Sequence, residues 1–195
     1  MLLGAEFEMG FWNAWIFMVP ALFVILLTIY VMIKKGASGG KARVRHVSKI
    51  TVIIASLSKF MLFPAAIYSV FLPLHFGTVW FYVGLLITLV GLVGTILILV
   101  GWARTSSGEP VTRGIYRYSR HPMYVTMVLV LLGLSIISVS WVFLVFTIIT
   151  GVGVTRPIFI RIEEAECLRY YGDAYREYMN RTPRWIGIPK SEKRE

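Results

Sequence analysis

Long apolar stretches separated by short basic segments dominate the chain. A helix that crosses the hydrocarbon core of a bilayer needs about 20 predominantly apolar residues. Five stretches reach or approach this length, and they cover residues 11–33, 50–74, 79–102, 123–138 and 141–160. The pattern therefore predicts an all-α integral membrane protein with five transmembrane helices.

Short connections and small residues indicate how these helices pack. Only residues 139 and 140 separate the fourth and fifth stretches, which predicts a tight helical hairpin, with a re-entrant pair as the alternative. Glycines recur on the third stretch at Gly84, Gly91 and Gly94, which predicts close helix packing there. Lys59 lies within the second stretch, where a lysine either faces protein or water or snorkels to the membrane surface.

The distribution of Lys and Arg predicts the orientation of the chain. Cytoplasmic loops carry an excess of these residues. Residues 34–49 contain six of them, residues 103–122 four and the tail from Arg161 eight, whereas the segment before the first stretch and residues 75–78 contain none. With five spans every basic connection lies on one side, so the N-terminus is predicted outside and the C-terminus in the cytoplasm.

Composition narrows the class of protein further. Hydrophobic residues make up 57% of the 195 residues and charged residues 15%, a balance that excludes disorder and argues against a soluble domain. The formal net charge of +10 is spread over the basic connections, so it predicts contact with membrane lipids and no nucleic-acid partner. The single cysteine, Cys167, excludes an internal disulfide framework and a metal site built from cysteines.

Residues 108–124 form the first polar segment with candidate chemistry. Pro122 suits the first turn of the fourth helix, which places His121 at the helix start beside backbone N–H groups that suit an anion. The alternative is purely structural: Arg117 and Arg120 snorkel, and the tyrosines of the segment form an interfacial aromatic belt.

Residues 161–166, which follow the fifth stretch, form the second such segment. Three carboxylates close to the membrane surface cost desolvation energy unless a cation lies near them. Local pairing with Arg161 and Arg169 is one explanation, and a cationic ligand is the other. A helix is predicted over residues 161–181, weakened at Gly172, and the hairpin brings both polar segments to one cytoplasmic pocket.

Two motifs in these segments occur together. The first is Arg120-His121-Pro122-Met123-Tyr124, preceded by Gly114-Ile115-Tyr116. The second is Glu163-Glu164, followed by Tyr171-Gly172-Asp173-Ala174-Tyr175, Tyr178 and Pro183. In this order they resemble the integral-membrane methyltransferases, in particular the isoprenylcysteine carboxyl methyltransferases and the related phospholipid N-methyltransferases. The resemblance covers about residues 108–185.

The resemblance implies S-adenosylmethionine as methyl donor, S-adenosylhomocysteine as product and a lipophilic acceptor. It divides the chain into membrane helices over residues 1–102 and a catalytic methyltransferase region over residues 103–195. By position it implies cofactor-binding roles for Pro110, Val111, Tyr116, Arg120, His121, Pro122, Met123, Tyr124, Glu163 and Glu164. His121 and Arg161 are the implied catalytic residues.

One position departs from the family pattern. The family commonly has an arginine four residues before the first glutamate of its pair, and here that residue is Phe159. The candidates to replace the arginine are Arg161 and Arg156, which occupy other positions around the helix.

The chemistry of the donor agrees with these residue types. A carboxylate such as Glu163 suits its ammonium group, and the faces of Tyr116 and Tyr124 suit its sulfonium. Methyl transfer is an in-line displacement that gains from alignment and exclusion of water. A prenylcysteine-type α-carboxylate is the expected acceptor and needs no general base, whereas the alternative, a phospholipid amine, would use His121 as proton acceptor.

Two other function classes remain as alternatives at this stage. One is an NADPH-dependent reductase of the sterol-reductase type, although the chain has no glycine loop that would cradle a phosphate. The other is a non-enzymatic sensor or transporter, although the last three stretches carry few polar groups. The expected location is the plasma membrane of a prokaryote or the endoplasmic reticulum of a eukaryote.

Overall fold

The computed structural model describes residue 10 and residues 12–35 and 62–189, and this part of the chain is helical. The α-helices are α1 (Trp15–Lys34), α3 (Leu62–Ser69), α4 (Val79–Arg104), α5 (Pro122–Ile137), α6 (Trp141–Val154), α7 (Pro157–Tyr171) and α8 (Asp173–Arg181). A short 3-10 helix, η1, spans Gly114–Arg117. The described residues form no β-strand, only an isolated bridge between Asn13 and Pro73. The predicted all-α class is confirmed for this part.

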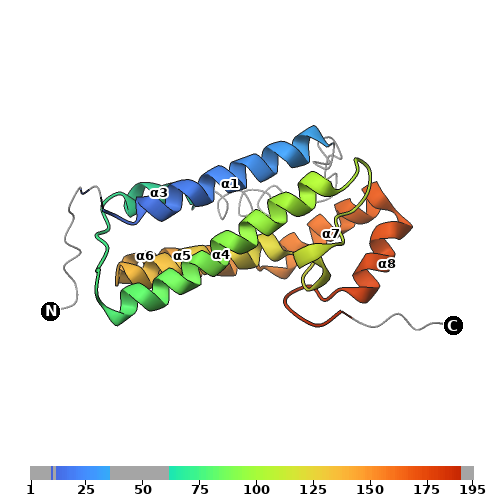
Figure 1. The fold of residues 1–195 in the computed structure, drawn as a ribbon. Helices are drawn as coiled ribbons and strands as arrows, with labels where there is room; N and C mark the ends of the chain where they lie inside the picture. The colour runs from blue at the N-terminus through green and yellow to red at the C-terminus, as the bar shows by residue number, and fades with distance from the viewer. Residues whose placement is uncertain (1–9, 11, 36–61, 190–195) are drawn as a thin grey trace.

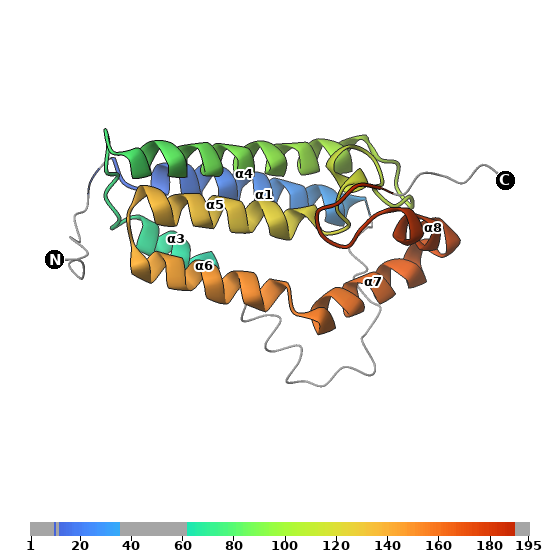
Figure 2. The same ribbon diagram turned by 90° about the horizontal axis from the view of Figure 1, so that it is seen from below.

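The long helices lie side by side in an elongated bundle (Figure 1). Helices α4 and α5 share the most extensive contact, α1 packs on α4, α6 packs on α5, and α3 contacts both α1 and α6. The connection from α4 to α5 gathers at one end of the bundle together with α7 and α8 (Figure 2). This end therefore contains both polar segments singled out in the sequence.

Glycines allow α4 and α5 to approach backbone to backbone. A Cβ atom at Gly84 would lie 2.6 Å from the Gly133 carbonyl oxygen, and one at Gly91 would lie 2.8 Å from the Val130 nitrogen. Both separations are too short for any side chain to be added without moving the facing helix. The close packing predicted from the glycines of the third stretch is thus confirmed for Gly84 and Gly91.

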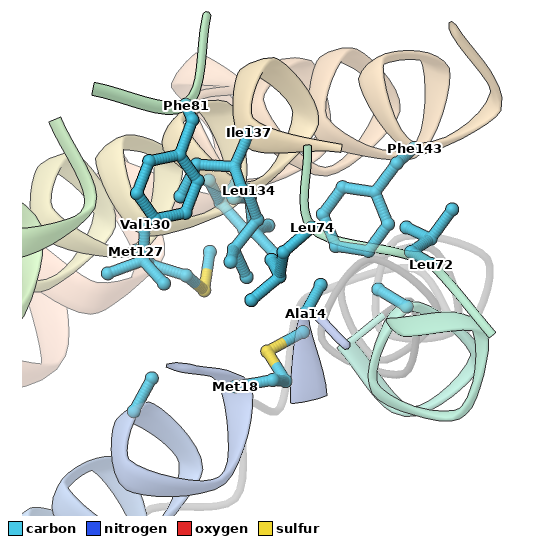
Figure 3. Packing of buried hydrophobic residues seen from close by; sticks show 14 residues of the cluster. Ala14, Met18, Leu72, Leu74, Phe81, Met127, Val130, Leu134, Ile137 and Phe143 are labelled. Atoms are coloured by element: carbon cyan, nitrogen blue, oxygen red, sulfur yellow. The ribbon is translucent and has the colours of Figure 1, made fainter. Parts of the chain in front are cut away.

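The main apolar core lies at the opposite end of the bundle. It is centred where the starts of α1, α4 and α6 meet the end of α5, and it extends along α5 as far as Met127. Figure 3 shows Met18, Phe81, Ile137 and Phe143 directed into it. Leu72, from the connection between α3 and α4, closes this core. The core fixes the helices relative to one another. The polar end of the bundle is therefore not needed to hold the helices together, and it can contain charged and aromatic side chains.

The predicted hairpin between the fourth and fifth stretches is present. Helix α5 ends at Ile137 and α6 begins at Trp141. The turn is tight because Val139 takes a left-handed conformation (φ 47°). The Ser140 hydroxyl accepts a hydrogen bond from the Phe143 amide at 3.2 Å, which caps α6.

The fifth stretch differs from its prediction as one helix over residues 141–160. The chain leaves the helix after Val154, and α7 begins at Pro157. Pro157 has no N–H to donate, and Arg156 before it takes an extended backbone (ψ 128°) because a residue preceding proline avoids the helical region. The helix predicted over residues 161–181 therefore starts earlier, and it divides at Gly172, which has a φ of +61°.

Two of the described helices, α1 and α4, are long and apolar enough to cross a membrane. Helices α5 and α6 are apolar but have only 16 and 14 residues. Of the second predicted stretch the described part is helical over Leu62–Ser69, while residues 50–61, with Lys59, lie outside the described residues. Five spans and their orientation accordingly stay predictions.

Large apolar side chains cover the outside of the bundle. Exposed examples on α1, α4 and α6 are Phe23, Leu26, Leu86, Val90, Ile148 and Val152. Water-soluble monomers rarely expose continuous apolar surface on this scale. Such a surface is what the hydrocarbon of a membrane would contact.

The α4–α5 contact gives a stability prediction with a matched control. In Gly133→Ala the new Cβ would lie 2.7 Å from the Gly84 carbonyl oxygen, so we expect the helices to be forced apart at a cost of about 1–3 kcal/mol. In Gly151→Ala the nearest atom, Cγ2 of Val128, would lie at an ordinary 3.6 Å, so this variant should lose no stability and gain up to about 1 kcal/mol from the helix propensity of alanine. Thermal unfolding of both variants in detergent tests this, and equal shifts would contradict the packing described.

Candidate functional site

The two polar segments meet beside the start of α5. His121 is the N-cap residue of α5, and Pro122 occupies its first turn, as the sequence predicts. The break at Pro157 starts a new helix, α7, which carries Glu163 and Glu164 past this point. Residues more than 40 positions apart in the sequence thus lie within contact distance.

The imidazole of His121 lies between the two carboxylates. Its Nδ1 is 3.6 Å from Oε2 of Glu163, and its Nε2 is 3.4 Å from Oε1 of Glu164. The ring is buried, and its centroid lies 6.0 Å from that of Tyr124, with the two planes only 12° apart. Both ring nitrogens therefore face acidic groups, which fixes the orientation of the imidazole.

Glu164 is the buried member of the acidic pair. Arg184 binds it with two hydrogen bonds, from Nε to Oε1 at 3.0 Å and from Nη2 to Oε2 at 2.7 Å. Arg120 adds an ion pair, with Nη1 3.0 Å from Oε1. Burial alone would raise the pKa of Glu164, but the hydrogen bonds and charges of the two arginines outweigh it and lower the pKa below its ordinary value. The negative charge of Glu164 is thus compensated by the two arginines.

Glu163 differs from Glu164 in its access to solvent. Its side chain is 34% exposed, against 5% for Glu164. The Tyr124 hydroxyl donates a hydrogen bond to Oε1 of Glu163 and so holds the carboxylate beside His121. Of the two acidic residues, Glu163 is the one that a ligand from solution can reach.

The loop that precedes His121 is held by an aromatic cluster. Tyr116 is buried, accepts a hydrogen bond from the Trp102 indole at 2.8 Å, and its burial raises the pKa of its phenol. The Tyr178 hydroxyl of α8 donates to the carbonyl oxygen of Tyr116 at 2.8 Å. Val111 and Met123 belong to the same cluster. These residues hold the loop in place.

Arg161 is directed toward a different feature of the described structure from the one that His121 occupies. It lines an open groove of about 600 Å³ together with Arg156, Pro157, Ile162 and Ala165, which lie just before α7 or within its first nine residues. None of the residues lining this groove contacts His121 through a hydrogen bond or an ion pair given by the structure. Arg156 and Arg161, the two candidates to replace the family's arginine at position 159, therefore line the same groove.

The structure brings together part of the residue set expected from the sequence. Arg120, His121, Tyr124, Glu163 and Glu164 form the charged cluster. Val111, Tyr116 and Met123 lie in the aromatic cluster, Pro122 is buried at the start of α5, and Pro110 is half-buried in the loop. Within residues 62–189 no set of three or more His, Cys, Asp and Glu side chains is arranged to hold a metal ion.

Arg184 and Trp185 are site residues that the sequence analysis missed. Arg184 binds Glu164 directly, and the Trp185 ring lies 6.1 Å from the His121 ring between centroids. The available signal was a cation followed by an aromatic residue directly after Pro183, where the helical pattern ends. That signal is weak, because nothing local indicates that this segment folds back onto the site.

Comparison with known proteins supports a family assignment. A family model described as phospholipid methyltransferase matches residues 75–174, just over half of the chain. No curated protein matches the chain significantly. No solved structure does so either. The matched family includes the isoprenylcysteine carboxyl methyltransferases, so the resemblance found in the sequence fits. Because this match covers more than half of the residues, the chain belongs to the phospholipid methyltransferase family.

Proposed function

We propose that this protein transfers a methyl group from S-adenosylmethionine to a lipid-linked acceptor at the cytoplasmic surface of a membrane. Membership of the phospholipid methyltransferase family supports the methyltransferase chemistry, since members typically use this donor. The observation that carries the proposal is the reachable carboxylate of Glu163, held beside His121 and Tyr124 at the end of an apolar bundle.

The chemistry of the cluster fits the cationic part of the donor. The carboxylate of Glu163 suits an ammonium group, and the rings of Tyr124 and Trp185 offer faces to a sulfonium, an attraction worth about 0.5–2 kcal/mol. When bound, S-adenosylmethionine supplies an electrophilic methyl group. The residues of this chain bind it, orient it and keep water away, which is where much of the rate of such a displacement arises.

The other residues of the expected site support this arrangement. Glu164, which is paired with Arg120, holds the imidazole of His121 in place. The proposed wall of the donor site consists of Pro110, Val111, Tyr116, Pro122 and Met123. Their burial, complete or partial, suits that role, because a dry wall strengthens the electrostatic attraction exerted by Glu163.

The proposed acceptor is a lipid-linked carboxylate of the prenylcysteine type. Two arginines, Arg156 and Arg161, line the groove at the start of α7, and guanidinium groups suit a carboxylate. Helix α6 has an exposed apolar face and ends at Val154, directly before Arg156 of this groove, so the lipid part of an acceptor could lie against that helix. A carboxylate attacks the methyl group without prior loss of a proton. An amine acceptor would instead need a group such as His121 to take a proton.

Donor binding gives the first functional prediction. Glu163→Gln removes the charge that faces the donor, and His121→Ala removes the ring that orients that charge. We expect each to weaken binding of S-adenosylmethionine about 10- to 100-fold, because a hydrogen bond to a charged group contributes about 1.5–3 kcal/mol. Glu177→Gln, at an exposed position of α8, should bind as the wild type does. Isothermal titration calorimetry on detergent-purified protein measures all four proteins.

A wild-type protein that binds neither the donor nor S-adenosylhomocysteine would refute the proposal. Normal donor binding by both Glu163→Gln and His121→Ala would place the donor elsewhere in the molecule. Such a result would also favour a non-enzymatic sensor or transporter over a methyltransferase that uses this site.

Acceptor use gives the second prediction. In a radiolabelled methyl-transfer assay across prenylcysteines and amine lipids, we expect the label on a prenylcysteine carboxylate. Arg156→Ala and Arg161→Ala should each raise the acceptor KM about tenfold and leave donor affinity unchanged. Arg169→Ala, an exposed arginine of the same helix, is the control. Label found only on amine lipids would replace the carboxylate with an amine as acceptor.

A further inference from the structure

A C-terminal strap, residues 182–189, passes directly over the start of α5. The Arg120 amide donates a hydrogen bond to the Pro183 carbonyl oxygen at 3.1 Å, and the Gly187 amide donates to that of Tyr118 at 3.0 Å. The Ser119 hydroxyl donates to the carbonyl oxygen of Arg184 at 3.4 Å. The strap is therefore fixed along the residues that lead into His121, as Figure 2 shows at the end of the bundle.

Arg184 extends from this strap to the buried carboxylate of Glu164. Its fork makes two parallel hydrogen bonds, at 3.0 and 2.7 Å, the arrangement in which a guanidinium binds a carboxylate most strongly. Arg120 approaches the same carboxylate differently. Its Nη1 lies 3.0 Å from Oε1 without a hydrogen-bond direction toward it. Arg120 thus supplies charge, whereas Arg184 supplies the directional bonds.

Resting on the methyl-transfer function proposed above, we infer that Arg184 is a positioning residue for the donor site. Its two hydrogen bonds hold Glu164 in one orientation, and Glu164 in turn holds Nε2 of His121. Glu164 is then fully engaged within the protein. The acidic group left facing a cationic donor is Glu163, which the Tyr124 hydroxyl and Nδ1 of His121 align.

The two glutamates thereby take different tasks although they are adjacent in the sequence. Without Arg184, Glu164 would keep the ion pair to Arg120 and the 3.4 Å contact with Nε2 of His121, both at Oε1. Oε2 would lose the Arg184 hydrogen bond, so the carboxylate could turn about its own side chain. The imidazole of His121 would then lose its fixed partner on one side. A lysine at position 184 would restore charge but not the fork, because an ammonium cannot bind both carboxylate oxygens in one plane.

The test compares donor affinity of Arg184 variants by calorimetry on the full chain in detergent. We expect Arg184→Ala to weaken binding of S-adenosylmethionine at least tenfold and Arg184→Lys at least threefold. Arg176→Ala removes an exposed arginine of α8 and should leave the affinity unchanged. Because Arg184 acts through Glu164, the double variant Arg184→Ala/Glu164→Gln should bind no more weakly than Glu164→Gln alone.

A pH series separates positioning from a general structural role. The groups that face Glu164 are Arg120, His121 and Arg184, with Cys167 and Tyr175 close enough to interact electrostatically. Arg184 helps to lower the pKa of Glu164, so its removal lets this carboxyl take up a proton at higher pH during acidification. The acid limb of donor binding should therefore move toward neutral pH in Arg184→Ala. A strap that merely stabilises the fold would lower the melting temperature and leave that limb in place.

The outcomes distinguish this inference from the function on which it rests. If wild-type protein binds the donor and folded Arg184→Ala binds it within twofold of the wild type, the positioning role is wrong and the proposed function stands. Additive losses in the double variant would also overturn it. If Arg184→Ala is not recovered folded, Arg184→Lys and Arg184→Gln are compared instead, and wild-type affinity in both refutes the role. Absence of donor binding by the wild type refutes the methyl-transfer function itself.

Discussion

A carboxylate buried at the end of an apolar helix bundle is stable only when cations and hydrogen bonds compensate its lost hydration. Glu164 meets this constraint with Arg120 from one segment and Arg184 from another. Each compensating group must come from a different part of the chain, because α7 itself presents only exposed arginines near this position. The need to neutralise one side chain therefore draws the loop before α5, the helix α7 and the C-terminal strap to a common point.

The apolar helices determine where these three segments meet. The glycines of α4 and α5 bring the two backbones into contact, and the core at the far end fixes the register of α1, α4, α5 and α6. The start of α5 is then a rigid platform for His121. The break at Pro157 has the complementary effect, since it lets α7 leave the line of α6 and pass the platform at an angle (Figure 2). Rigid helices and one break thus position a charged cluster that a continuous helix would have placed elsewhere.

Helix positions were predictable where local chemistry decides them. Helices α1, α4 and α5 lie within a few residues of the apolar stretches because apolar length and capping residues such as Thr78, whose hydroxyl caps α4, act locally. The fifth stretch was predicted too long, since hydropathy continues through residues 155–160 while Pro157 interrupts the hydrogen bonding. Gly172 was identified as a weak point, and its left-handed backbone is indeed where the C-terminal helix divides.

The sequence by itself determined the helical class, the apolar exterior and the two motifs that resemble the methyltransferase family, because each depends on composition or on spacing along a short segment. Only the tertiary structure decided that His121 lies between Glu163 and Glu164 and that Arg184 binds the buried one. The reason is physical: these partners are 20 and 43 residues from Glu164 along the chain, and nothing local records such distances. Which of two adjacent carboxylates is buried, and which is partly exposed, follows from the folding of distant segments onto them.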